Sequence, residues 1–184
     1  MENMKYISIS AMGKDRPGIV ARFSKVLFDA GCNLEESSML LIRSEFAMVL
    51  IVALPAKFPE QKFRDSIDRI SKELDLTTSI RILSKDEAKT QKVKSELLYV
   101  LSVYGADKPG IVYNITQKLA ELQINITDLS TRILSGGETP VYLMLLEIEL
   151  VDEQQLEFLP VELDKLKKIL KVDITLNQAE STDF

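Results

Sequence analysis

The stretch GKDRPGIV at residues 13–20 returns as GADKPGIV at residues 105–112. In both places Asp, a cation and Pro-Gly form a turn-like signal that runs directly into an apolar helix pattern. A shift of 92 residues places 13–42 over 105–134 with nine identical residues in thirty. The stretch is therefore one landmark of a longer internal repeat.

The repeat continues beyond this window at a shift of 96 residues. The run MVLIVAL at 48–54 falls on MLLEIEL at 144–150. At the same shift the apolar positions of a helical pattern coincide, with Phe63, Ile67, Ile70 and Leu74 over Leu159, Leu163, Leu166 and Leu170. The repeat therefore covers each half of the chain. It predicts two domains, at 1–84 and 96–184, joined by a charged linker at 85–95.

Each half is expected to follow the order strand, helix, strand, strand, helix, strand. Alternating apolar residues mark the strands, and an i, i+4, i+7 pattern marks the helices. In the first half the strands are expected at 5–13, 33–43, 45–54 and 76–83, and the helices at 17–31 and 58–74. This order predicts an α+β fold of two ferredoxin-like domains, with both helices on one face of an antiparallel sheet.

Three local features refine this expectation. Pro17 suits a first helical turn, and Gly31 suits a helix C-terminus. Pro160 falls within a helical pattern, where a proline removes a hydrogen bond, so the regular helix is expected to start there. The second hairpin carries four extra residues in LSGGETPV (134–141), at a Gly-Gly turn that tolerates added length.

The composition of the 184-residue chain excludes several classes of function. With 46% hydrophobic and 28% charged residues, the chain suits a soluble globular protein without a membrane span. It has no histidine, hence no imidazole catalysis or histidine-ligated metal, and its single cysteine, Cys32, cannot form an intramolecular disulfide. The net charge of −5 argues against direct nucleic-acid binding, and the absence of a secretory signal favours the cytoplasm.

The repeated loop has the chemistry of a small anion site. The first amides of a helix have no intrahelical partners and attract a carboxylate. Gly18 and Gly110 leave room for a ligand at the backbone. Asp15 and Asp107 are expected either to cap the helices or to accept a ligand ammonium group. The alternative is a structural turn and helix cap alone.

The segments DRPGIVARFSKVLFDAGCNLEESSM and DKPGIVYNITQKLAELQINITDLST resemble the ACT domain, a small ferredoxin-like module. The marks are the D-x-P-G-I loop, the amphipathic helix and an Asn that opens strand two. The resemblance implies amino-acid binding between paired ACT domains. The implied ligand residues are Asp15, Arg16, Pro17, Gly18, Ile19 and Asn33 in the first half, and Asp107, Lys108, Pro109, Gly110, Ile111 and Asn125 in the second.

A chain of two ACT domains and little else also implies a role. It is similar to non-catalytic regulators that sense an amino acid such as glycine and repress transcription of the glycine cleavage operon through a DNA-binding activator. No cofactor is expected, and the pairing of domains within a chain or in a homo-oligomer stays open. The two halves differ at one position of this pattern, because the second half has Gln123 where the first half has Gly31. The two sites are therefore expected to differ in shape or occupancy.

Other functions remain as alternatives. An acylphosphatase-like hydrolase on the same fold would use the loop amides for a phosphoryl group, with Arg16 and Asn33 as its catalytic pair. The module could also regulate another metabolic enzyme or serve only for dimerisation. Cys32 could act as a redox sensor. A role as a buried apolar residue is favoured instead, because no second cysteine lies nearby.

Overall fold

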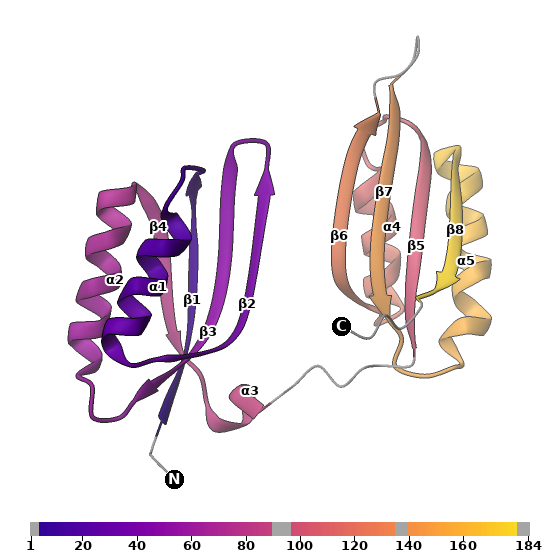
Figure 1. Cartoon of the computed structure of the whole chain (residues 1–184). Coiled ribbons are helices and arrows are strands. Elements are labelled where there is room, and N and C mark those ends of the chain that lie inside the picture. The colour runs from indigo at the N-terminus through magenta and orange to yellow at the C-terminus, as the bar shows by residue number, and fades with distance from the viewer. Residues whose placement is uncertain (1–3, 90–96, 135–139, 180–184) are drawn as a thin grey trace. The chain divides into compact units, whose positions relative to one another are not determined.

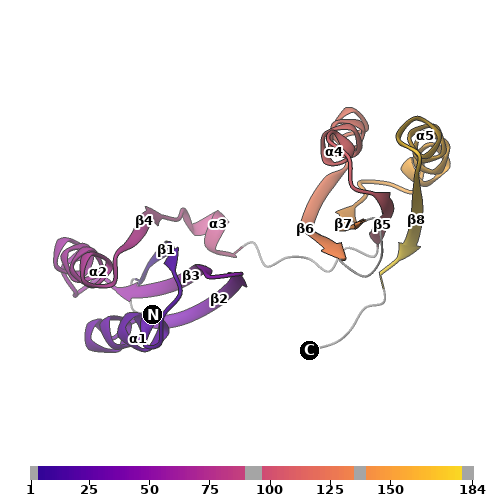
Figure 2. The same cartoon turned by 90° about the horizontal axis from the view of Figure 1, so that it is seen from above.

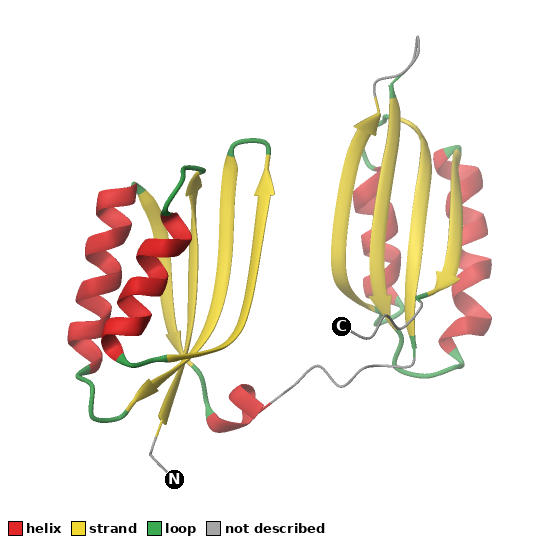
Figure 3. Cartoon of the chain, in the orientation of Figure 1, coloured by secondary structure: helices red, strands yellow, loops and turns green. Residues whose placement is uncertain are grey.

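The computed structural model describes residues 4–89, 97–134 and 140–179. The chain divides into two compact units, residues 1–91 and 92–184. Each unit is a four-stranded antiparallel sheet with two helices packed on one of its faces, as Figures 1 and 2 show. The predicted α+β, ferredoxin-like fold is confirmed, and Figure 3 shows the same succession of helices and strands in both units.

In the first unit the sheet has the strand order β2-β3-β1-β4. Strands β1 and β3 pair from Met4↔Pro55 to Lys14↔Glu45. A short helix, α3 (Lys85–Lys89), lies within the segment predicted as a linker. The elements of the unit are β1 (Met4–Lys14), α1 (Ile19–Ala30), β2 (Asn33–Ile42), β3 (Glu45–Pro55), α2 (Glu60–Leu74) and β4 (Leu76–Ile82).

The second unit repeats this topology with the strand order β6-β7-β5-β8. The Gly-Gly insertion predicted in the hairpin between β6 and β7 lies outside the described residues. The elements are β5 (Leu98–Ala106), α4 (Ile111–Glu121), β6 (Asn125–Leu134), β7 (Val141–Glu149), α5 (Gln155–Leu170) and β8 (Val172–Gln178).

Each unit has its own hydrophobic core between sheet and helices. In the first core Phe23 of α1 and Phe63 of α2 are fully buried against alternate residues of the sheet. In the second, Ile115 of α4 and Leu159 of α5 occupy the corresponding layer. Since burying one such side chain stabilises by about 1.5–3 kcal/mol, these cores hold the helices firmly on their sheets. None of the helices in the described residues is long and apolar enough to span a bilayer.

The predicted start of the last helix at Pro160 is wrong, because α5 begins at Gln155 and Pro160 lies inside it. Polar side chains hold the early start. The Gln155 amide donates to Asp152 Oδ1 at 3.1 Å, and Gln155 Nε2 donates to the Leu122 carbonyl at 2.8 Å. A proline this near the N-terminus loses only one intrahelical bond, which these contacts offset.

One further expectation at a helix end needs correction. Helix α1 begins at Ile19 with Gly18 as its N-cap, so Pro17 precedes the helix instead of lying in its first turn. Gly31 ends α1 in the left-handed conformation, as predicted. Gln123, with φ of 57°, takes a left-handed φ at the position of Gly31, but α4 ends one residue earlier than α1, at Glu121.

Candidate functional site

The two repeated loops occupy the same place in their units, between the end of the first strand and the start of the first helix (Figure 1). In the first unit the Asp15 amide donates to the Ser44 carbonyl at 2.8 Å, which ties the loop to the tip of the β2–β3 hairpin. This loop is therefore fixed at one end of its sheet, beside the edge strand β2.

Glycine determines the backbone of both loops. Gly18 and Gly110 both have φ of 95°, in the left-handed region that other residues adopt at a cost. The first intrahelical bonds run from the Arg22 amide to the Gly18 carbonyl and from the Asn114 amide to the Gly110 carbonyl. The amides before Arg22 and Asn114 thus point out of the helix ends, where they can donate to an anion.

Asp15 and Asp107 do not cap these helices, which corrects one of the two roles expected for them. Neither helix has a side-chain cap, because the left-handed glycine occupies the N-cap position itself. Both aspartates are exposed, and both line the cavity at their loop. They remain available to a cationic group of a ligand.

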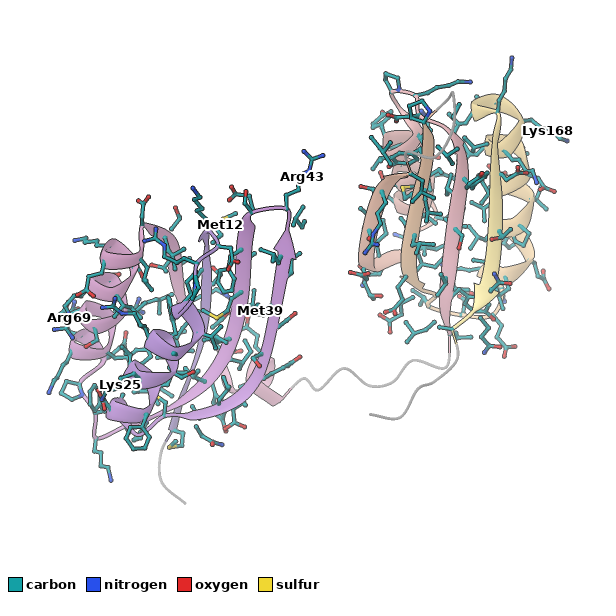
Figure 4. The ribbon with its side chains drawn as sticks, turned by 45° about the horizontal axis from the view of Figure 1, so that its top comes forward. Met12, Lys25, Met39, Arg43, Arg69 and Lys168 are labelled. Carbon is teal, nitrogen blue, oxygen red and sulfur yellow. The ribbon has the colours of Figure 1, made fainter. Side chains whose placement is uncertain are left out.

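The loop of the first unit borders an apolar cavity. This cavity has a volume of about 290 Å³ and is lined by Asp15, Arg16 and the α1 N-terminus on one side. Its other walls are Met39 and Leu41 of β2 and Phe46 of β3. Figure 4 labels Met39 on β2, and Arg43 at the tip of the same hairpin. Beside the loop, this cavity therefore offers only aliphatic, thioether and phenyl groups to a ligand.

The loop of the second unit borders a larger and more polar cavity of about 590 Å³. Its lining includes Asp107, Lys108, Tyr113 and Tyr142. The Tyr142 ring is buried, and its hydroxyl hydrogen-bonds with the Thr131 side chain. Burial raises the pKa of Tyr142, and the negative charge of Asp107 adds to this effect. Asp107 and Tyr142 therefore both line the cavity beside the second loop.

The contrast between the loops comes from three positions of the repeat. Ala21, Met39 and Phe46 of the first unit correspond to Tyr113, Thr131 and Tyr142 of the second. These exchanges place two phenol hydroxyls and one aliphatic hydroxyl around the second loop. Sequence reasoning missed them, although the repeat alignment already held the signal, because the pairing of β2 with β3 was needed to bring them to the loop.

The two asparagines do not join the loops within their own units. Asn33 pairs with Ala53, whereas Gly13 at the loop pairs with Phe46. Seven residues along β3 separate these levels, or about 23 Å at the usual rise of a strand. Asn125 lies equally far from its loop. Within a unit the asparagine therefore does not lie beside the loop, and the alternative of an Arg16–Asn33 catalytic pair is wrong.

Cys32 lies at this same far end of the first unit and packs against its core. Burial raises the pKa of its thiol to about 11, which keeps it protonated at neutral pH. The described residues contain no cluster of three or more acidic or cysteine side chains able to hold a metal ion.

Sequence comparisons place the chain among known proteins. It matches the ACT domain family over residues 5–81 and again over residues 88–177. A UPF0237 protein of Methanopyrus kandleri is 39% identical over 67 residues, which are 36% of this chain and 74% of that protein. The glycine cleavage system transcriptional repressor of Escherichia coli strain K12 is 24% identical over 132 residues, 72% of this chain and 67% of that protein.

Two solved structures share the fold over nearly the whole chain. An uncharacterised protein of Galdieria sulphuraria has a TM-score of 0.79 and 26% identity, covering 97% of this chain and 100% of that one. The structure of a candidate glycine cleavage system transcriptional repressor has a TM-score of 0.72 and 23% identity, covering 97% and 99%. The tandem arrangement of two such units thus recurs in solved structures.

Proposed function

The chain belongs to the ACT domain family, and on that premise we propose that it is a non-catalytic regulator that senses an amino acid at its second loop. It is an ACT-domain regulatory protein related to the glycine cleavage repressor and to the UPF0237 proteins. The observation that carries the proposal is the cavity around residues 107–113, which is larger and more polar than the cavity at the first loop.

Three groups in this cavity match the parts of an amino acid. The free amides at the start of α4 donate to the α-carboxylate, with Lys108 adding positive charge. Asp107 accepts the α-ammonium group in a charge-assisted hydrogen bond. The Tyr142 hydroxyl is placed to bind a small polar side chain or a bound water. Serine and glycine fit this set best, because neither brings apolar bulk.

The strand asparagines complete such a site only from another ACT domain. Asn125 lies about 23 Å from the loop of its own unit, by the rise of a strand. When two β edge strands pair antiparallel, the start of one strand lies beside the end of the other. A second ACT domain paired in this way would bring its Asn33 or Asn125 to the loop, and ligand binding would then be coupled to domain pairing.

We further propose that the sensed amino acid controls transcription through a protein partner. The Escherichia coli relative is, by its name, a repressor of the glycine cleavage system. By analogy, this chain would act in the cytoplasm and repress the glycine cleavage operon by binding its DNA-binding activator. Direct DNA contact is disfavoured by the net charge of −5.

Isothermal titration calorimetry of the full chain with glycine, serine, alanine and leucine tests the sensor role. We expect binding of the small amino acids, with loss of the heat in the Asp107→Asn variant. Absence of heat from all twenty amino acids, together with turnover of an acyl phosphate, would replace the sensor by a hydrolase. A separate experiment tests the activator. The purified activator is mixed with the chain, and their association is measured with and without the amino acid.

A further inference from the structure

Helix α5 of the second unit carries an apolar surface that its own core does not explain. Leu159, Leu163 and Leu166 form its buried face. Phe158 and Ile169 lie outside that face and are 60% and 71% exposed. Both of these large apolar side chains are therefore left to solvent within the unit.

These two residues are the ends of a single line along the helix. Phe158, Glu162, Lys165 and Ile169 follow each other at spacings of 4, 3 and 4 residues. At 3.6 residues per turn the four side chains fall within about 60° of one another. We call this line the α5 stripe. From its N-terminal end, the stripe consists of an apolar, an acidic, a basic and an apolar side chain.

The first unit shows that the fold itself does not require this stripe. At the repeat shift of 96 residues, the corresponding positions of α2 are Lys62, Ser66, Arg69 and Glu73. Glu73 forms an ion pair with Arg22 of α1, and the position of Arg22 is taken by Asn114 in the second unit. The same helix in the same fold is thus solvated in one copy and apolar at both ends in the other.

The order of the residues in the stripe makes it complementary to itself. If a two-fold axis passes between residues 163 and 164, the α5 helix of a second copy lies antiparallel to the first. Phe158 would then meet the Ile169 position of the second copy, and Glu162 would meet its Lys165. A parallel arrangement would instead set Glu162 against Glu162, which repels.

We propose that the α5 stripe is an interface between two copies of this chain, in which the two α5 helices pack antiparallel about a two-fold axis. The choice of a second copy as the occupant rests on the order of the charges along the stripe. Glu162 accepts a hydrogen bond from Lys165 at 2.5 Å and pairs with Lys118 at 3.4 Å, and these partners lower its pKa and keep it ionised. Lys168, labelled in Figure 4, lies on α5 outside the stripe.

The expected affinity follows from the small area of the contact. Stable dimers bury about 1,200–2,000 Å² in total, and a helix of 16 residues offers less than this by itself. The exposed Val161 of α5 extends the apolar part of the surface. We therefore expect a weak association.

Charge reversal across the axis tests the pairing. Sedimentation equilibrium of the full chain between about 1 µM and about 1 mM should show an assembly with an even number of chains. Lys165→Glu and Glu162→Lys each create two like-charge contacts, and each should weaken the association by about tenfold or more and lower the molar mass toward half. An equimolar mixture of the two variants restores opposite charges and should restore the association.

Controls separate this surface from other causes. Arg69→Glu changes the corresponding position of α2 and should leave the molar mass unchanged. Phe158→Asp combined with Ile169→Asp should abolish the association while circular dichroism and amino-acid binding stay as in the wild type. A monomer at every concentration, reversal variants that associate like the wild type, or a mixture that fails to recover would each overturn the proposal.

Discussion

The two repeated loops have nearly the same backbone and different surroundings. Gly18 and Gly110 share φ of 95°, and each leads into a helix whose first amides are free. Around the first loop lie Met39 and Phe46, whereas Thr131 and Tyr142 lie around the second. The loop backbone is thus the same in both copies. The side chains of the neighbouring strands differ, and they determine which groups can contact a ligand.

The same division recurs on the outer helices. In the first unit the exposed side of α2 is charged and α1 and α2 are joined by the Arg22–Glu73 ion pair, whereas α5 exposes Phe158 and Ile169. On α2 and α5 the shared buried positions stay apolar while the exposed positions have changed. A duplicated unit can keep its fold with one set of residues and vary its binding surfaces with another, because the two sets point to opposite sides of the same elements.

The largest difference between the loops should appear when their aspartates are neutralised. We expect Asp107→Asn to weaken amino-acid binding by about tenfold to a hundredfold, because a hydrogen bond to a charged group contributes about 1.5–3 kcal/mol. Asp15→Asn should change the affinity by less than about threefold, as for an exposed surface charge. Calorimetry of both variants checks this, and an equal loss in the two would remove the distinction between the loops.

Replacing the loop glycines tests the backbone that the two copies share. Gly18→Ala and Gly110→Ala should each cost about 1–2 kcal/mol of unfolding free energy, because alanine is strained at this φ. A Cβ at position 110 would also come within 3.3 Å of Asn114 Nδ2, whereas nothing lies within 4 Å at position 18. Urea unfolding should therefore find Gly110→Ala the more destabilising of the two. The reverse order would contradict this geometry.

Removal of the Tyr142 hydroxyl should have a smaller effect on ligand binding. Tyr142→Phe makes the second loop resemble the first and should weaken binding of serine by about fivefold to tenfold, since a neutral hydrogen bond contributes about 1 kcal/mol. Phe46→Tyr is the matched change in the first unit and should leave serine affinity as it is. Unchanged binding in Tyr142→Phe would show that the ligand does not reach this wall of the cavity.

The smallest effect is expected at the helix ends. Gln123 holds the left-handed conformation that Gly31 holds in the first unit. Gln123→Gly should therefore stabilise the chain by about 0.5–1 kcal/mol, and Gly31→Gln should destabilise it by a similar amount. Thermal unfolding of both variants measures this. A destabilised Gln123→Gly would mean that the Gln123 side chain makes a stabilising contact.

Much of the fold could be predicted from the sequence because the repeat supplies each element twice. The periodic positions Phe63, Ile67, Ile70 and Leu74 predicted a helix whose buried face is indeed formed by these residues. Pro160 misled the prediction, because helix propensity is local and the start of α5 is held by Gln155, which reaches Leu122 across the unit.

The site was predicted less completely. The motif located Gly18 and Gly110, whose conformation depends on neighbours in the chain. The partners of the loops depend on strand register, which places Phe46 and Tyr142 beside the loops and the start of β2 at the far end of the sheet. Sequence proximity of Asn33 to the helix that follows the loop gave the opposite impression, because that helix runs the full length of the sheet between them.

Amide chemical shifts during a titration with serine or glycine test the central claim most directly, because they report on each loop separately. In ¹⁵N-resolved spectra we expect the amides of Gly110 and the first turn of α4 to shift at lower ligand concentrations than those of Gly18 and the first turn of α1. Equal shifts at both loops, or shifts confined to Gly18 and its neighbours, would contradict the assignment of the second loop as the amino-acid site.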